Sequence, residues 1–217
     1  MKRKIALLVY PEFSMQEIAN LSYVLRWNSE TYTDIIATTK DVIVSEEGIQ
    51  VMPNKTVDEF LVDDYDCLIL SGCSDFRIAL RDPKLKAFLE TLKDKQELLI
   101  GAICAGPIFL AQAGLLEGKK YTDSLFVEVR ELFPFIEADN FVAAPVVEAG
   151  NIITANGSAF NAFAVSICRK LGYTLPDKIM SGYVDAYTEE DYMHHLPEEE
   201  RKGFIEEFVD IIESESR

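Results

Sequence analysis

One cysteine stands where a nucleophile could act. Residues 101–107 are Gly-Ala-Ile-Cys-Ala-Gly-Pro, so that Cys104 follows an apolar run and precedes small residues that open a second apolar segment. This is the pattern of a nucleophile elbow, in which small neighbours permit a strained turn between a buried strand and a helix. Free N–H groups at the helix start stabilise a thiolate, so we expect the pKa of Cys104 to be depressed.

Cysteine is also a common small apolar residue of protein cores, and this alternative has to be weighed for each thiol. Cys67 and Cys168 fall within apolar periodic segments, and we interpret both as core residues. The order of strand, cysteine, small residues and helix favours a reactive role for Cys104 instead. The four cysteines form no C-x-x-C pair and have no histidines at ligand spacing, so we expect reduced thiols and no metal site.

The elements that must position Cys104 alternate between strands and helices. Apolar runs predict buried strands at residues 4–10, 33–38, 66–72 and 97–103, and hairpins at 41–52 and 141–155. Periodic segments predict helices at residues 14–27, 83–92, 105–113, 125–132 and 158–171. This alternation predicts an α/β fold with a doubly wound, mostly parallel sheet that has helices on both faces.

The composition changes near the C-terminus. Residues 174–217 hold 13 acidic and 4 basic side chains, which gives 4 − 13 = −9, and the apolar residues around Phe204 and Phe208 follow a helical period. We therefore divide the chain into a core domain of residues 1–173 and an acidic helical extension of residues 174–217 that packs on the core.

The net charge excludes some partners. The chain of 217 residues has a formal charge of −16, which repels nucleic acid phosphates and anionic membranes. The N-terminal apolar run before Pro11 is too short for a signal peptide or a membrane span, so we expect a cytoplasmic protein.

Three segments follow predicted strands and carry polar or reactive groups: residues 11–17, 71–74 and 104–107. In open parallel sheets, ligands bind at the carboxyl ends of the strands, near the point where the strand order reverses. We therefore expect these three segments to meet at one site.

The motif around Cys104 resembles a known family. Residues 102–107, Ala-Ile-Cys-Ala-Gly-Pro, and residues 113–120, Ala-Gly-Leu-Leu-Glu-Gly-Lys-Lys, are similar to the cysteine elbow and the following segment of the ThiJ/PfpI superfamily, which is related to the class I glutamine amidotransferases. The order of elements matches that family over about four-fifths of the chain. The resemblance implies a flavodoxin-like fold and a homodimer.

The family's second functional residue is a carboxylate just after the first strand, and Glu17 stands at that position. The resemblance implies that Glu17 is hydrogen-bonded to the sulfur of Cys104. An alternative is a capping box, in which Ser14 is the N-cap and Glu17 the N3 residue of a helix. The two interpretations compete for one side chain.

The resemblance also implies an oxyanion hole. In the family, backbone N–H groups after the third strand and after the nucleophile hold the developing charge. By that correspondence the donors here are the N–H groups of Cys73 and Ala105. Cys73 replaces the usual second glycine, and an ordinary loop turn with a free thiol is the alternative.

The largest departure concerns histidine. Family enzymes with a Cys–His pair place histidine directly after the cysteine, where this chain has Ala105, or shortly after the second motif, where Asp123 stands. Asp123 is therefore a possible third member, although a helix N-cap is the simpler interpretation. The histidines of the chain, His194 and His195, lie in the acidic extension.

These observations support two hypotheses. The first is a cysteine-dependent hydrolase or lyase for a small carbonyl compound or similar electrophile, of glyoxalase, deglycase or hydratase type, without metal or organic cofactor. The second is a redox sensor or stress-response protein that uses oxidation of Cys104. Ala105 argues against a protease, and the acidic extension argues against a DNA-binding regulator.

Overall fold

The computed structural model describes residues 4–29, 33–175 and 198–206. Within these residues a seven-stranded sheet has the order β5-β2-β1-β6-β7-β9-β8, and the pairs are parallel except β8 with β9. The strands are β1 (Ile5–Leu8), β2 (Asp34–Ala37), β5 (Lys55–Thr56), β6 (Cys67–Leu70), β7 (Leu99–Ile103), β8 (Val146–Ala149) and β9 (Ile152–Ala155). The α/β prediction is confirmed.

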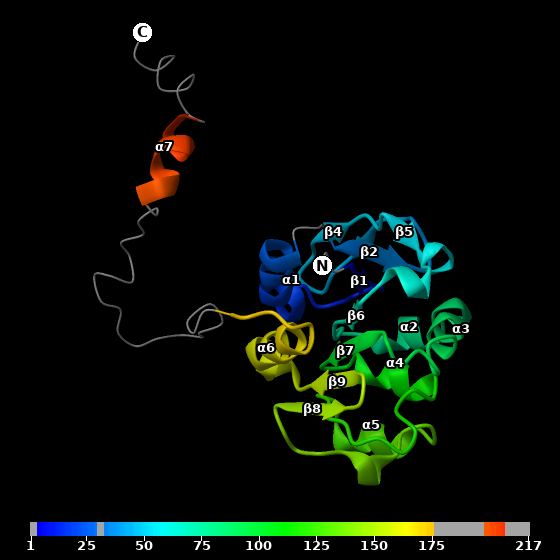
Figure 1. The fold of residues 1–217 in the computed structure, drawn as a ribbon. Coiled ribbons are helices and arrows are strands. Elements are labelled where there is room, and N and C mark those ends of the chain that lie inside the picture. Colours follow the sequence, from blue (N-terminus) through cyan, green and yellow to red (C-terminus); the bar gives the residue numbers. More distant parts are fainter. Residues whose placement is uncertain (1–3, 30–32, 176–197, 207–217) are drawn as a thin grey trace. The chain divides into compact units, whose positions relative to one another are not determined.

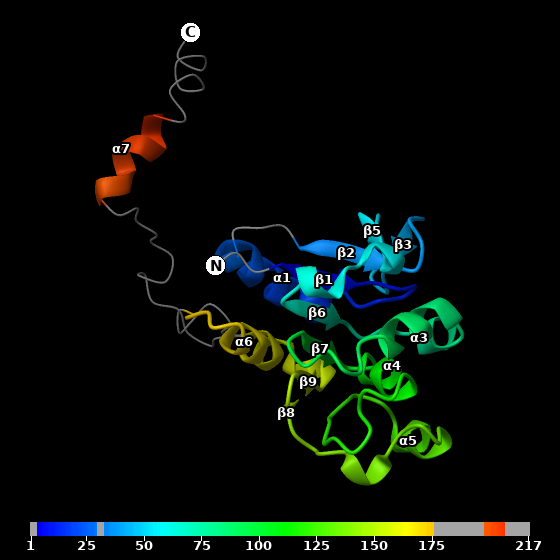
Figure 2. The ribbon, with the colours of Figure 1, turned by 45° about the vertical axis from the view of Figure 1, so that its right-hand side comes forward.

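Helices cover both faces of this sheet. Helices α1 and α6 lie side by side on one face, and α2, α3 and α4 lie on the other (Figures 1 and 2). The α-helices of the described residues are α1 (Gln16–Ser29), α2 (Phe76–Leu80), α3 (Pro83–Glu90), α4 (Pro107–Gln112), α5 (Val127–Leu132), α6 (Phe160–Lys170) and α7 (Glu198–Glu206). Short 3₁₀ turns occur at Val57–Glu59, Val62–Asp64, Ala138–Asn140 and Gly157–Ala159.

Two antiparallel pairs correspond to the predicted hairpins. Strands β3 (Ile43–Val44) and β4 (Gln50–Val51) form a small separate pair, and β8 pairs with β9 at the edge of the main sheet. The strand order reverses at β1, which has β2 on one side and β6 on the other. The segments that follow β1, β6, β7 and β9 therefore emerge at one edge of the sheet.

The chain divides into two compact units, residues 1–180 and 181–217. The described part of the second unit is helix α7, whose Lys202 pairs with Glu206 at 3.9 Å. Packing of the acidic extension on the core stays a prediction.

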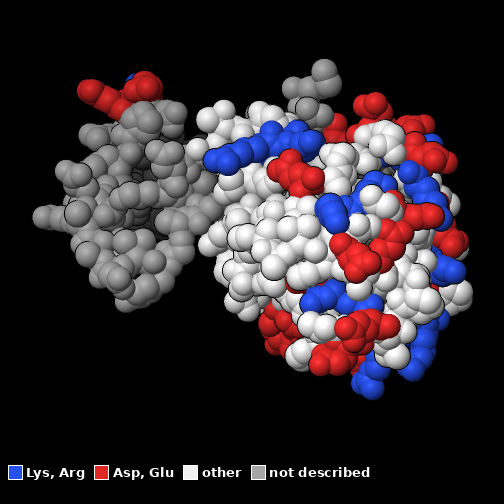
Figure 3. Space-filling model, turned by 90° about the horizontal axis from the view of Figure 1, so that it is seen from below, with Lys and Arg blue, Asp and Glu red and all other residues white. Residues whose placement is uncertain are grey.

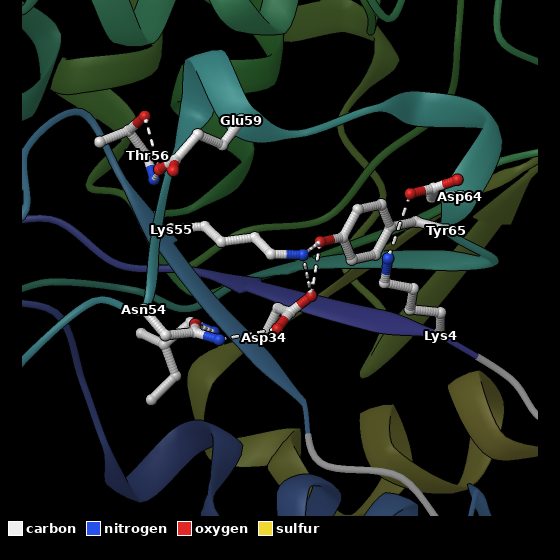
Figure 4. A network of polar contacts seen from close by, with 9 residues as sticks. Lys4, Asp34, Asn54, Lys55, Thr56, Glu59, Asp64 and Tyr65 are labelled. Carbon is white, nitrogen blue, oxygen red and sulfur yellow. Dashed lines mark hydrogen bonds and ion pairs between the residues drawn. The ribbon is translucent and has the colours of Figure 1, made fainter.

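A polar network fastens the edge strand β5 to β2. The carboxylate of Asp34 accepts hydrogen bonds from Lys55 at 2.8 Å, from the Tyr65 hydroxyl at 2.6 Å and from Asn54 at 2.7 Å (Figure 4). The ammonium group of Lys4 lies 4.6 Å from the centre of the Tyr65 ring. These contacts hold a two-residue strand that has little apolar surface of its own to bury.

The surface mixes charges of both signs. On the face shown in Figure 3, lysine and arginine side chains are interspersed with aspartate and glutamate, so this face presents no continuous basic stripe. Among the helices of the described residues, none is both long and apolar enough to cross a lipid bilayer.

Candidate active site

Cys104 occupies a strained turn directly after strand β7. Its φ is +59°, in the left-handed region that side chains other than glycine rarely adopt. The N–H of Cys104 donates to Ala155 at 2.9 Å, and its carbonyl accepts from Ser124 at 3.0 Å. Both neighbouring segments therefore hold the strained backbone in place, and the elbow predicted from the sequence is confirmed.

Two glycines enclose the sulfur because they lack side chains. A Cβ atom on Gly72 would lie 2.6 Å from the Cβ and 2.9 Å from the Sγ of Cys104. A Cβ atom on Gly157 would lie 3.1 Å from the same Sγ. Gly72 follows β6 and Gly157 follows β9, and these strands flank β7 in the sheet. The sheet thus brings glycine backbone against the thiol from both sides.

Glu17 lies against the thiol and is held by the backbone. Its Oε2 accepts a 2.6 Å hydrogen bond from the Gly72 N–H, and a hydrogen bond joins its carboxyl group to the sulfur of Cys104. The structure therefore brings Glu17 and Cys104 together as the family resemblance implies.

The alternative capping box is not formed. The Ser14 N–H, which a capping box would give to Glu17, donates to the Gly72 carbonyl at 2.9 Å. The N–H groups of Met15 and Gln16 donate to the carboxylate of Glu47, at 3.1 and 2.9 Å. Glu47 comes from the turn between β3 and β4, so a distant residue caps α1 and Glu17 faces the site.

Ser124 is the residue beside the sulfur that the sequence analysis missed. Its hydroxyl forms a hydrogen bond with Cys104 and accepts one from the Gly157 N–H at 2.8 Å. The place beside the thiol that a histidine could have occupied therefore holds a hydroxyl group. The nearest sequence signal is the position of Ser124 directly after Asp123, in the segment after the second motif, and this position alone does not place the hydroxyl at the thiol.

The carboxylate of Asp123 belongs to a separate buried ion pair. It is 2% exposed, and its Oδ1 accepts from the Leu125 N–H at 3.0 Å and from Arg130 at 2.5 Å. The guanidinium of Arg130 lies 3.9 Å from the centre of the Phe141 ring. These contacts fix the segment that carries Ser124. Helix α5 begins at Val127 with Phe126 at its N-cap and has no side-chain cap, so the interpretation of Asp123 as a helix N-cap is wrong.

The two predicted oxyanion donors, the N–H groups of Ala105 and Cys73, have different surroundings. The Ala105 N–H donates to the sulfur itself. Cys73 faces Phe13 in a short antiparallel bridge flanked by the bonds from Ser14 to Gly72 and from Ser74 to Glu12, at 2.9 and 3.1 Å. In such a pair the N–H of Cys73 points away from Phe13 and stays outside the bridge.

The expected depression of the cysteine pKa is wrong. Burial, and then the negative charge of Glu17, raise the pKa of Cys104 to about 12, while hydrogen bonds from Ser124 and Ala105 lower it by less. Burial also raises the pKa of Glu17. The sequence argument weighed the helix start but could not weigh the loss of solvent at the thiol. Two acids that face each other at this distance titrate as a coupled pair.

Three expectations remain beyond the geometry. His194 and His195 lie outside the described residues, so their relation to the thiol is not addressed by the structure. The absence of a cofactor and the homodimer stay predictions.

A cavity of about 720 Å³ reaches residues that neighbour the site in the sequence, but neither Cys104 nor Glu17 lines it. Its lining includes Thr122, and also Asn156 and Ser158, which flank the glycine that touches the sulfur. Its remaining lining is mostly apolar, from Phe141, Pro145 and small alanines. A small organic molecule fits such a space.

Comparison with known proteins agrees with this geometry. The profile of the DJ-1/PfpI family matches residues 3–170. The chain belongs to the DJ-1/PfpI family. The family assignment made from the two motifs is therefore confirmed.

Individual relatives are distant and carry different names. The chain is 29% identical over 149 residues to the "Uncharacterized protease YoaZ" of Bacillus subtilis, covering 68% of this chain and 70% of that protein. It is 26% identical over 125 residues to the "Deglycase PfpI" of Pyrococcus furiosus, covering 57% and 66%. The solved structure of the DJ-1 superfamily protein Atu0886 from Agrobacterium tumefaciens superposes with a TM-score of 0.71 at 24% identity, covering 81% and 93%. The structural likeness shows the fold alone.

Proposed function

We propose that this protein is a cysteine-dependent enzyme that acts on a small carbonyl compound, of the 2-oxoaldehyde class. The observation that carries the proposal is the sulfur of Cys104, held on a strained turn beside the carboxyl group of Glu17. The name of the Pyrococcus relative, a deglycase, supports carbonyl chemistry.

Transfer of a proton between Cys104 and Glu17 gives each of these two groups a role in the proposed reaction. When the proton resides on Glu17, the Cys104 thiolate adds to the aldehyde carbon, and a carbon–sulfur bond forms as the carbonyl π electrons move to oxygen. The N–H groups of Cys73 and Ala105 stabilise that oxygen, and Glu17 then protonates it to give a hemithioacetal.

Glu17 as a carboxylate next removes the proton from the former aldehyde carbon and returns it to the neighbouring carbonyl oxygen, which gives an enediol. Glu17 then takes the proton of the first hydroxyl and delivers it to the second carbon, which gives a 2-hydroxy thioester. Water cleaves the carbon–sulfur bond of the thioester, releases a 2-hydroxy acid and returns the thiol. The sum of the steps is the addition of one water to the 2-oxoaldehyde, so no redox partner is needed.

Peptide hydrolysis is less well supported. The Bacillus relative is named a protease, but amide cleavage needs a general acid for an amine leaving group. Ala105 follows Cys104 here, and Ser124 occupies the other place beside the sulfur. A hydroxyl group cannot replace an imidazole as a base near neutral pH.

The test is consumption of methylglyoxal by the purified protein, with D- and L-lactate measured as products. Cys104→Ser and Glu17→Gln are compared with Cys168→Ser, which alters a buried cysteine of helix α6. We expect turnover in the wild type and in Cys168→Ser, and loss in the two site variants. Wild-type consumption equal to that of Cys104→Ser would refute the proposal.

A redox role is the second candidate, and the hydroxyl group beside the thiol favours it. An oxidised sulfur of Cys104 would receive hydrogen bonds from Ser124, from the Ala105 N–H and from protonated Glu17, the groups that contact the thiol in this structure. Treatment with hydrogen peroxide followed by mass spectrometry distinguishes the two. A sensor takes up two oxygen atoms at Cys104 and shows no methylglyoxal turnover.

A further inference from the structure

A second cavity lies at the ends of two other strands, and neither Cys104 nor Glu17 lines it. It has a volume of about 400 Å³, within the range of small-molecule sites. It is bounded by residues 9–12 after β1, residues 38–39 after β2, the strand β3, helix α2 and the start of α3. In the sheet order, β6 lies between β1 and the strand that carries Cys104.

The interior of this cavity is apolar in character. Val9, Ile43, Ala79 and Leu85 are buried side chains of its wall, and Val42 at the rim is 49% exposed. Part of this apolar surface is exposed to water. A ligand that covers it lowers the free energy, because apolar surface is removed from water.

The polar groups of the wall already bond to one another. Asp82 accepts from the Thr38 hydroxyl at 2.7 Å and from the N–H groups of Lys84 and Leu85 at 2.9 and 3.3 Å. The Tyr10 hydroxyl donates to the Ser71 carbonyl. A ligand inside the cavity therefore needs few hydrogen-bonding groups, because the polar groups of the wall already have partners.

The half-buried Glu12 differs from these groups, because its carboxylate retains an acceptor that no other wall group uses. Its Oε2 accepts from the Ser74 hydroxyl at 2.9 Å, which leaves the acceptor capacity of the second oxygen. Glu12 has a φ of +64°, and among the described residues only Cys104 shares this feature outside glycine. Its N–H donates to Val44 and its carbonyl accepts from Ser74, at 2.9 and 3.1 Å, so the strained backbone is fixed at the cavity rim.

We propose that this cavity binds a small primary amine whose aromatic or branched apolar body fills it and whose ammonium group lies against Glu12. Asp82 and the nearby Asp41 disfavour an anion in this region, and the ammonium group of Lys84, which donates to the Thr38 carbonyl at 3.1 Å, offsets one of these two charges. The chain's net charge of −16 also attracts cations over anions.

The probe is 2-phenylethylamine, titrated calorimetrically into the full chain at neutral pH. 2-Phenylethanol, which has the same apolar body without the charge, and phenylacetate, which has the opposite charge, are titrated in parallel. We expect the amine to bind about threefold to fivefold more tightly than the alcohol, as an ion pair at an exposed rim allows, and phenylacetate to bind most weakly.

Four variants test where the probe binds. Glu12→Gln should bring the amine affinity down to that of the alcohol, and Glu128→Gln, an exposed carboxylate on α5, should leave it unchanged. Val42→Trp adds bulk at the half-exposed rim without burying it, and should weaken amine and alcohol alike by about tenfold. Cys104→Ser should bind as the wild type, which separates this site from the proposed catalysis.

The proposal is overturned if neither the amine nor the alcohol binds the folded wild type. It is equally overturned if Val42→Trp binds normally, because the probe then lies elsewhere. Equal affinities of amine and alcohol in the wild type would remove the assigned role of Glu12 and refute the amine class.

Discussion

The carboxylate of Glu47, and not that of Glu17, accepts the free N–H groups at the start of helix α1. These two residues lie 30 positions apart (47 − 17), and the β3–β4 turn brings them to one helix end. Capping by a distant residue lets Glu17 point to Gly72 and Cys104.

The contacts of Glu47 at the start of helix α1 predict the effect of removing this residue. Burial opposes it, but hydrogen bonds from Ser45, Gln16 and Met15 lower the pKa of Glu47 to about 2. A depressed pKa contributes stability above the unfolded value of 4.5 and loses it as the pH falls through about 2. Glu47→Ala should therefore cost about 1 kcal/mol at neutral pH, measured by urea unfolding, and the difference should vanish in acid. A loss of equal size at all pH values would contradict this account.

Replacing Glu17 should separate thiol reactivity from catalysis. The charge of Glu17 is one cause of the raised pKa of Cys104, so Glu17→Gln should lower the midpoint of the pH profile for alkylation by iodoacetamide. Turnover of methylglyoxal should instead fall about 10²- to 10⁴-fold, because the proton carrier is gone. Peptide mapping must show that Cys104 is the alkylated residue. If alkylation and turnover change in the same direction, Glu17 has no separate role in proton transfer.

The two glycines at the sulfur should differ in their tolerance of alanine. A Cβ atom on Gly72 meets the Cβ of Cys104 at 2.6 Å, and that Cys104 atom is tied to strained backbone. A Cβ atom on Gly157 first meets Glu17 Oε1 at 2.8 Å, the end of a side chain that can rotate. Gly72→Ala should therefore cost about 1 to 3 kcal/mol of stability, and Gly157→Ala less than about 1 kcal/mol.

Both alanine variants should nevertheless lose turnover, because each displaces the carboxylate or the sulfur. Calorimetric melting and methylglyoxal assays on the same preparations provide the two readings. A Gly157→Ala protein with full activity would show that Glu17 need not hold its present position.

The buried pair of Asp123 and Arg130 should stabilise the segment that carries Ser124. Arg130→Met leaves the Asp123 carboxylate buried without its counter-charge and should cost about 3 to 5 kcal/mol. Burial already raises the pKa of Asp123, so the ionised form is the unfavourable one and the cost should grow as the pH rises. Unfolding at several pH values tests this. Arg130→Lys, which retains the charge, should recover part of the stability, and a loss independent of pH would exclude the ion pair as its cause.

The sequence was sufficient for the elements but not for every contact at the site. The apolar run before Cys104 and the small residues after it determine a strand and a turn by local chemistry, and these predictions are confirmed. The place of Ser124 depends on how residues 122–125 pass the ends of β7 and β9, which no local pattern encodes.

The direction of the thiol pKa depends on burial in the same way. The helix start is visible in the sequence, whereas the solvent lost at Cys104 becomes visible only when Gly72 and Gly157 lie against it. The local sequence likewise could not decide between a capping box and a site role for Glu17. The helix start is capped by Glu47, which comes from another part of the chain.

The thiol of Cys104 is enclosed by groups from positions 17, 72, 124 and 157, so its surroundings exist only when four distant stretches of chain are folded together. Cys104 is itself only partly buried, so a small alkylating reagent reaches it in the native fold. The pH dependence of that alkylation can consequently report whether the surroundings are assembled, because departure of one of these stretches should return the pKa of Cys104 toward the free-thiol value of about 8.5.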